Sequence, residues 1–280
     1  IYDHLKSSYE TLISTDLRGL EFLEKENCNS IVINTPKLNN LLLLPFSLIK
    51  IFFLMIRSLI LLKKKNISIL ISTGGYMSLP LCLAAKVLGI KIFLVEPNVV
   101  LGRANKFFLN FSDKLLCYSK KIINLPKKFE KKQIIINPLI RRKYYKEKNS
   151  QKDDGLFTIT IIGGSQGAQI FDTLVNQTII NISRVHPLKI IHQTSKKNIE
   201  FLKNFYEKNK IKNNVFTFDH NLNLLLEHTD LCISRAGASS LAELSILKIP
   251  FIAIPLPSSK DNHQYENAKS YSDKGCCWLI

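Results

Sequence analysis

The sequence lacks the side-chain patterns from which most metal sites and disulfide frameworks are built. Its six cysteines are Cys28, Cys82, Cys117, Cys232, Cys276 and Cys277. None shows CxxC spacing and no histidine cluster lies beside them, which argues against zinc. They lie mostly in apolar stretches and are typical of small buried residues in a reducing compartment. No Asp-x-Asp motif and no His/carboxylate cluster is present, so we expect neither a metal nor a cofactor.

Acidic residues are scarce as well, with 22 Asp and Glu against 39 Lys and Arg, a formal net charge of +17. Such an excess favours acidic partners such as nucleic acid, anionic lipid or phosphorylated substrates. A lysine-rich genome explains the same number, and net charge alone leaves both explanations open. The hydrophobic share of 46% and the charged share of 22% are ordinary for a globular protein and exclude a wholly disordered chain.

The chain has no initiating methionine and no signal peptide, since Ile1-Tyr2-Asp3-His4 does not begin a basic and then apolar run. Its last residues, Trp278-Leu279-Ile280, resemble the middle of a strand. We therefore expect a fragment that lacks both termini and is inactive by itself.

One apolar run, residues 41–62, is long enough to span the hydrocarbon core of a bilayer. Pro45, Lys50 and Arg57 interrupt it, and charges at that depth are costly in a membrane span. Four large apolar residues of the run recur at helical spacing: Ile49, Phe52, Phe53 and Ile56. With basic residues beside them, they are typical of a helix that rests on an anionic membrane surface. A core helix carries a similar stripe, but the wide apolar arc favours docking.

Short apolar runs alternate with amphipathic stretches along the whole chain. The expected strands are residues 67–72, 90–95, 114–118, 157–162, 188–192, 215–218, 231–234 and 250–254. Helical patterns lie between them, as at 79–88, and this alternation predicts parallel sheets covered by helices, formed twice. The polar segment 146–154 predicts a linker, which gives an N-terminal domain at 1–145 and a C-terminal domain at 146–280.

The strand expected at 157–162 runs into a glycine-rich segment, Gly163-Gly164-Ser165-Gln166-Gly167-Ala168. Glycines let a backbone approach a phosphate, a following helix start offers free N–H groups, and the Ser165 hydroxyl adds a donor. The spacing is neither the dinucleotide GxGxxG nor a P-loop. A phosphate loop on Gly163, Gly164 and Gly167 is the favoured interpretation, and a simple strand-to-helix turn is the alternative.

Two further stretches of the second half carry candidate ligand residues. Small residues from Ala238 to Ser240 follow the strand at 231–234, where helix-start amides can face an anion. Ser240 and Glu243 form an S-x-x-E capping box, so spacing alone favours Glu243 as a cap over a ribose ligand. Further on, three polar residues can share one helical face: His263, Gln264 and Asn267. Amides suit sugar hydroxyls, although each residue taken singly is typical of a solvated surface.

In the first half, a glycine turn at 72–76 follows one expected strand, and Glu96-Pro97-Asn98 ends the next. Ligand sites of open α/β sheets lie at the carboxyl ends of strands. We therefore expect all five constellations to face one cleft between the two domains.

Together, in this order, these motifs resemble the MurG family, whose members add N-acetylglucosamine to the membrane-bound precursor of bacterial peptidoglycan. The resemblance runs nearly the whole length and is carried by Thr15-Asp16-Leu17-Arg18-Gly19, Gly74-Gly75-Tyr76, Glu96-Pro97-Asn98 with Gly102 and Asn105-Lys106, residues 163–168, residues 235–243, and His263-Gln264 with Asn267-Ala268. It implies two Rossmann-like domains facing across a cleft, the GT-B type, and a role in cell-wall biogenesis, cell shape and cell division.

The resemblance also implies a site for UDP-N-acetylglucosamine in the C-terminal half. Ser165 would contact phosphate, Asp219 would hold uracil through its backbone, and Glu243 would bind ribose. The residues implied for the diphosphate and the sugar are Ala238, Ser239, Ser240, His263, Gln264 and Asn267, with Asn98 reaching across from the other domain.

The N-terminal half would hold lipid I and meet the anionic bilayer, as a peripheral protein on the cytoplasmic face of the inner membrane, with no nucleic acid bound. The implied reaction is inverting: the C4 hydroxyl of the muramyl sugar attacks the anomeric carbon, a base accepts its proton, and UDP leaves. Glu96 is a candidate base, and orienting its own loop is the alternative role.

The sequence departs from the family pattern in places. Asn137-Pro138-Leu139-Ile140-Arg141 replaces the family's Asn-Pro-x-Arg, which leaves the reach of Arg141 to the nucleotide open, and Val95 and Pro97 replace a His and a Gln. Two other interpretations also stay open. One is another GT-B glycosyltransferase or a UDP-sugar epimerase, and the other is a non-catalytic nucleotide-binding membrane adaptor.

Overall fold

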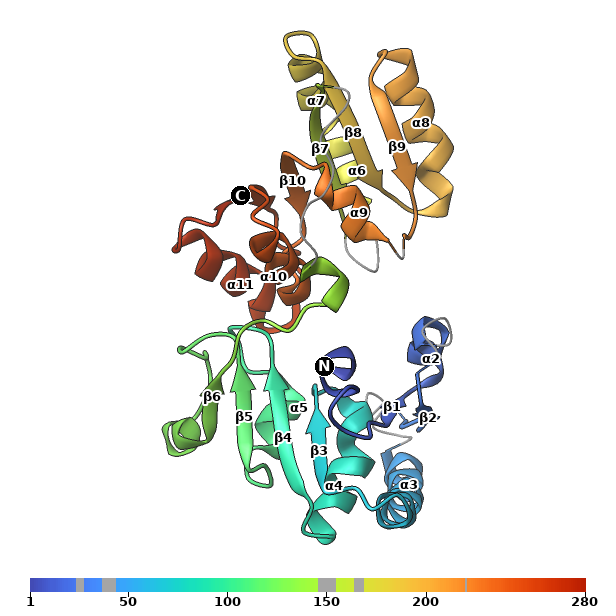
Figure 1. Ribbon diagram of the computed structural model, residues 1–280, viewed down its shortest axis with the longest axis vertical. Coiled ribbons are helices and arrows are strands. Elements are labelled where there is room, and N and C mark those ends of the chain that lie inside the picture. Colours follow the sequence, from blue (N-terminus) through green and yellow to red (C-terminus); the bar gives the residue numbers. More distant parts are fainter. Residues whose placement is uncertain (24–27, 37–43, 146–154, 164–168, 220) are drawn as a thin grey trace. The chain divides into compact units, whose positions relative to one another are not determined.

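A computed structural model describes residues 1–23, 28–36, 44–145, 155–163, 169–219 and 221–280 of the chain. It divides into two units, Ile1–Asn137 and Pro138–Ile280, and each unit contains a parallel β-sheet (Figure 1). The division precedes the boundary expected at 145/146 because Ile140 and Tyr144 are buried in the core of the second unit. The linker expected at 146–154 lies outside the described residues.

The first unit is built on a four-stranded parallel sheet in the order β3-β4-β5-β6. Its strands are β1 (Ile13–Thr15), β2 (Ser30–Val32), β3 (Ile69–Ser72), β4 (Lys91–Glu96), β5 (Lys114–Cys117) and β6 (Gln133–Ile135). Its helices are α1 (Tyr2–Leu5), α2 (Leu17–Leu23), α3 (Leu44–Lys64), α4 (Leu79–Val87) and α5 (Arg103–Phe108), with 3₁₀ turns η2 (Tyr76–Ser78) and η3 (Lys127–Lys132). Strands β1 and β2 pair separately from the main sheet.

The second unit is built on a six-stranded parallel sheet in the order β12-β11-β10-β7-β8-β9. Its strands are β7 (Phe157–Ile162), β8 (Leu188–Gln193), β9 (Lys212–Phe216), β10 (Leu231–Ser234), β11 (Phe251–Ala253) and β12 (Cys277–Leu279). Its helices are α6 (Phe171–Leu174), α7 (Asn176–Ser183), α8 (Ile199–Lys208), α9 (Leu222–Glu227), α10 (Ala238–Ile246) and α11 (His263–Ser272), with 3₁₀ turns η4 (Arg142–Tyr145), η5 (Lys196–Asn198) and η6 (Lys260–Asn262). The predicted two-domain α/β fold is confirmed.

The strand order of the second unit contains a topological switch point between β7 and β10. The chain builds β7, β8 and β9 outward to one side, then returns to β10 beside β7 and builds β11 and β12 to the other side. The two strands lie in register, with Ile162 opposite Ser234 at their carboxyl ends. In doubly wound α/β sheets, ligands bind in the crevice outside this point.

Most expected strands match the structure within a few residues, but the strand expected at 215–218 was misplaced. β9 begins at Lys212 and ends at Phe216. Its first three residues, Lys212, Asn213 and Asn214, are polar because β9 is the edge strand of the sheet. An edge strand needs little apolar surface, so hydrophobic periodicity does not reveal where it starts.

Candidate active site

The first part of the predicted donor site follows β7 at the switch point. Gly163 is buried directly after Ile162, and the backbone N–H of Arg235 donates to the Ile162 carbonyl (3.3 Å). The chain after β10 therefore lies against the start of the glycine-rich segment. Gly164, Ser165 and Gly167 lie outside the described residues, and the next described helix, α6, begins at Phe171.

The second part is the start of α10, immediately after the loop that follows β10. Gly237 precedes the helix with extended backbone angles (φ −67°, ψ 138°), and the first helical bond runs from Leu241 N–H to the Gly237 carbonyl (3.0 Å). The N–H groups of Ala238, Ser239 and Ser240 therefore have no partner within the helix, at the positive end of its dipole. Such an end is suited to a diphosphate.

This helix start corrects the predicted capping box. Because α10 begins at Ala238, Ser240 lies inside its first turn and not at its N-cap, and the helix has no side-chain cap. Glu243 is therefore not a reciprocal cap. It lies in the second turn, where its carboxylate accepts a hydrogen bond from the Tyr144 hydroxyl; burial first, and then the Glu243 charge, raises the pKa of Tyr144.

The polar residues of α11 have distinct roles in the structure. The Leu256 N–H donates to Gln264 Oε1 (2.9 Å), so the amide oxygen of this predicted ligand residue already binds the segment after β11. Asn267 is 2% exposed, and its Nδ2 donates to the Ala236 carbonyl (3.3 Å). His263 is half-buried, and its Nδ1 lies 2.7 Å from the Lys260 carbonyl. Asn267 thus ties α11 to the loop before α10, a role that the surface interpretation did not anticipate.

Asp219 lies after the carboxyl end of β9, at the expected position for a base-binding loop. Its Oδ1 accepts a hydrogen bond from the Asn221 N–H (2.7 Å), which fixes the turn that leads into α9. The side chain is thereby used within its own loop, and a uracil contact through the backbone of Asp219 stays a prediction.

In the first unit, Glu96 organises the loop that follows β4. It is 1% exposed. Its Oε1 accepts bonds from the backbone N–H (3.1 Å) and the side chain (3.0 Å) of Asn98, and its Oε2 accepts bonds from Gly102 N–H (2.7 Å) and Asn105 Nδ2 (2.9 Å). Four donors occupy the two oxygens of this buried carboxylate. This arrangement favours the loop-orienting role over that of a base.

The glycine turn after β3 packs against the same group of residues. Gly74 and Gly75 both have positive φ (83° and 84°), a backbone conformation that residues other than glycine rarely adopt. A Cβ on Gly74 would also lie 3.1 Å from Oδ1 of the buried Asn105. Strands β3 and β4 are neighbours, so both motifs meet at one edge of the sheet, as predicted from their positions after strands.

From Leu44 onward, the apolar run forms the helix α3, which packs along α4 (Figure 1). Its inner face holds buried Ile51 and Leu62. Its outer face exposes large apolar side chains by these fractions: Phe46 72%, Ile49 56%, Phe52 55%, Phe53 64%, Ile56 38% and Ile60 64%. The interpretation as a core stripe is therefore wrong for the four predicted residues. By length and composition alone, α3 is also apolar enough to cross a membrane, with a mean hydropathy of 2.0.

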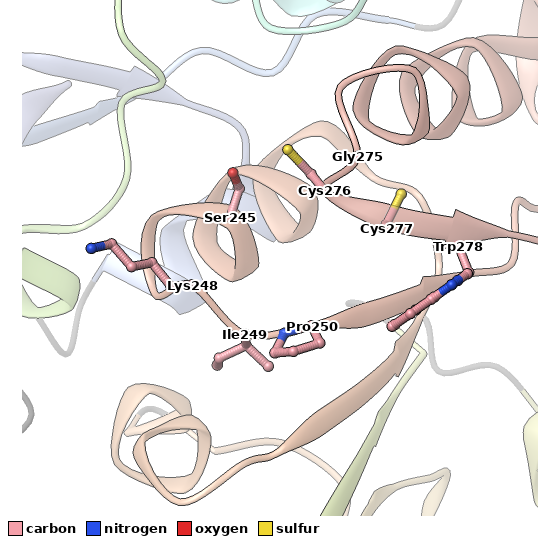
Figure 2. Close-up of a pocket in the computed structure, with 8 residues that line it drawn as sticks. All are labelled: Ser245, Lys248, Ile249, Pro250, Gly275, Cys276, Cys277 and Trp278. Atoms are coloured by element: carbon pink, nitrogen blue, oxygen red, sulfur yellow. The ribbon is translucent and has the colours of Figure 1, made fainter.

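A hollow of about 510 Å³ in the second unit lies away from these motifs (Figure 2). Pro250 and Cys276, which precede β11 and β12, contribute to its lining together with Trp278. It therefore lies at the amino ends of these strands, and none of the predicted site residues lines it.

Known proteins resemble this chain along its whole length. Family models for the glycosyltransferase family 28 N-terminal and C-terminal domains match residues 3–117 and 158–280. A Pelagibacter ubique protein named UDP-N-acetylglucosamine--N-acetylmuramyl-(pentapeptide) pyrophosphoryl-undecaprenol N-acetylglucosamine transferase is 46% identical, over all of this chain and 79% of its own length. A protein of the same name from Rickettsia bellii is 34% identical, over 99% of this chain and 79% of its own length. The crystal structure of MurG from Acinetobacter baumannii superposes with a TM-score of 0.75 at 23% identity, over 99% of this chain and 78% of that one.

Proposed function

Because the chain belongs to the MurG family of glycosyltransferases, we propose that it transfers N-acetylglucosamine from UDP-N-acetylglucosamine to lipid I, the undecaprenyl-pyrophosphoryl-muramyl-pentapeptide, to give lipid II. The observation that carries this conclusion is the 46% identity, over the entire chain, to a relative named for that transfer. A glycosyltransferase with a different acceptor, or an epimerase, would share the fold. Neither would account for sequence identity to this relative that extends through both domains.

The donor is proposed to bind at the switch point of the second unit. The free N–H groups at the start of α10 would receive the diphosphate. Ser165 is also proposed to contact phosphate. The Glu243 carboxylate would accept hydrogen bonds from the ribose hydroxyls, and the backbone at Asp219 would hold uracil. Gln264, His263 and Asn98 are proposed to bind the sugar.

The reaction requires one bond to form and one to break. The C4 oxygen of the muramyl sugar forms a bond to the anomeric carbon, while the bond from that carbon to the β-phosphate oxygen breaks and UDP leaves. Negative charge develops on the departing phosphate, where the α10 amides would stabilise it without reorganising. The acceptor hydroxyl loses its proton to a base outside the Glu96 group, because that carboxylate already accepts four hydrogen bonds.

The outer face of α3 is proposed to attach the protein to the cytoplasmic face of the inner membrane. Lys50, Arg57, Lys63 and Lys64 are exposed along the same helix, where they would meet anionic headgroups. This placement would bring the first unit to a lipid-linked acceptor while the nucleotide sugar arrives from solution.

The proposal is tested by extending the chain at both ends to the length of its relatives, incubating the purified protein with UDP-[¹⁴C]N-acetylglucosamine and a short-chain lipid I analogue, and separating the products. Radioactive lipid II is the expected product. Conversion of the nucleotide sugar to its C2 epimer would establish the epimerase alternative. Tight UDP binding without any turnover of either kind would favour a non-catalytic adaptor.

A further inference from the structure

A buried polar cluster in the second unit has no place among the donor residues proposed above. Asp172 of α6 is 2% exposed, and His192 of β8 and Tyr206 of α8 are both 0% exposed. Asp172 Oδ2 accepts hydrogen bonds from Thr194 Oγ1 (2.8 Å) and Asn198 Nδ2 (2.5 Å). Its other oxygen lies 3.4 Å from His192 Nε2, and a hydrogen bond of 2.8 Å joins His192 Nδ1 to the Tyr206 hydroxyl.

These contacts fix α6 to the carboxyl end of β8. His192 and Thr194 lie at the end of that strand, and Asn198 lies in η5 just after it. α6 is the first described helix after Gly163, the start of the proposed phosphate loop. Asp172 therefore fixes the start of α6 against the segment that follows β8.

A second set of contacts continues from α6 across the switch point. The Phe171 ring lies 4.9 Å from the guanidinium carbon of Arg235, which follows β10. Arg235 Nη1 donates to the carbonyls of Ile254 (3.2 Å) and Pro255 (2.9 Å), after β11. The next residue, Leu256, donates its N–H to Gln264. Side chains thus join the carboxyl ends of β8, β10 and β11 to α6 and α11.

Burying the Asp172 carboxylate costs free energy, which suggests that the group has a role beyond packing. A carboxylate removed from water loses hydration that only well-placed donors restore, and an apolar side chain of the same volume often gives equal stability. Burial alone would raise the pKa of Asp172, but His192, Asn198 and Thr194 reverse this, and its pKa lies below the ordinary value. The carboxylate is thus kept charged where it fixes directional bonds, as expected of a group that holds a binding loop in place.

We propose that Asp172 is a positioning residue for the nucleotide sugar, and that it acts through Phe171 and Arg235 to hold the segments that follow β10 and β11 in one arrangement. This inference rests on the proposed donor site. Loops that are already ordered bind with less loss of conformational freedom, so loosening them lowers affinity without removing any ligand contact. Arg235 also acts as a positioning residue, since its guanidinium is engaged by backbone carbonyls.

The test compares UDP affinity, measured by calorimetry, for the wild-type protein and three variants that are each confirmed as folded by circular dichroism. Asp172→Ala is expected to weaken UDP binding at least about tenfold. Asp172→Asn keeps an oxygen for Thr194 and Asn198 and is expected to stay within about threefold of wild type. Asp230→Ala is the matched control, because Asp230 Oδ2 accepts the Thr158 N–H (2.8 Å) at the opposite, amino end of β7. It is expected to lower the melting temperature and leave UDP affinity unchanged.

A double variant, Asp172→Ala with Arg235→Ala, tests whether the two residues act as one unit. Its loss of affinity is expected to be smaller than the product of the two single losses. Unchanged affinity in folded Asp172→Ala, or an equal loss in Asp230→Ala, would overturn the inference while leaving the donor site intact. If the wild-type protein itself binds no UDP, the proposed function fails and this inference fails with it.

Discussion

Replacing Phe52 with aspartate examines whether the outer face of α3 binds a membrane. Phe52 lies on a face whose large apolar residues are exposed, and it is itself 55% exposed. Neither Phe52 nor Phe53 belongs to the buried core of the first unit, so the substitution should leave folding intact. On a bilayer, by contrast, both side chains would be buried among lipid headgroups and acyl chains.

The size of the effect follows from exposure and charge. Full burial of a Phe side chain contributes about 1.5–3 kcal/mol, so burying the exposed half of Phe52 contributes about 1 kcal/mol. A new negative charge near an anionic surface costs about another 1 kcal/mol. The sum, about 2 kcal/mol, corresponds to roughly 30-fold weaker partitioning. Phe52→Asp combined with Phe53→Asp doubles this free energy and should abolish detectable binding.

The assay is sedimentation with vesicles that contain anionic lipid, at increasing salt. Wild-type binding should fall with salt without vanishing, because only the charged part of the interaction is screened. Phe201→Asp is the matched control, since Phe201 is 53% exposed on α8 of the other unit. This variant should bind vesicles as the wild-type protein does. UDP affinity should be unchanged in all variants. Normal vesicle binding by the folded double variant would refute the reasoning, and its unfolding would show that these residues belong to the core.

Three further predictions concern individual side chains. Glu243→Ala should weaken UDP affinity about 10–100-fold, as for a lost hydrogen bond to a charged group. It should also remove the preference for UDP over 2′-deoxy-UDP measured by calorimetry, and a variant that keeps the wild-type preference would exclude ribose binding by Glu243. Glu96→Gln places an amide against four N–H donors, so it should lower the melting temperature and the transferase turnover. The acid limb of the pH–rate profile should stay in place, and loss of that limb would identify Glu96 as the base. Burial raises the pKa of Cys82 to about 11 and that of Cys117 to about 12. Because only thiolates react with iodoacetamide, neither cysteine should be alkylated at pH 8 until the protein is unfolded, as followed by mass spectrometry.

The sequence was informative where local chemistry determines the structure. Apolar runs predicted the buried strands because a parallel strand covered on both faces needs them, as in β7. Gly74 and Gly75 marked a turn because positive φ demands glycine there. Residues placed after strands met at the carboxyl edge of each sheet because parallel strands share that direction.

The sequence was less informative where contacts between distant residues determine the structure. Asn267 can be buried because its amide donates to the Ala236 carbonyl, 31 residues away, and the helical spacing of Asn267 does not predict that contact. Asp172 finds its donors 22 and 26 residues further along the chain. His192 gave one signal, a histidine directly after the apolar pair Ile190-Ile191 of β8. The S-x-x-E spacing misled because Gly237, three residues before Ser240, is the N-cap, so α10 begins at Ala238.

Calorimetric titration of the purified protein with UDP-N-acetylglucosamine, UDP, NAD and ATP tests the central claim most directly. We propose that the diphosphate binds at the start of α10 and the ribose at Glu243, within a site for one uridine nucleotide. Saturable binding of UDP and UDP-N-acetylglucosamine at one site is expected, with no measurable heat from NAD or ATP at the same concentrations. Binding of NAD or ATP as tight as that of UDP would contradict this proposal.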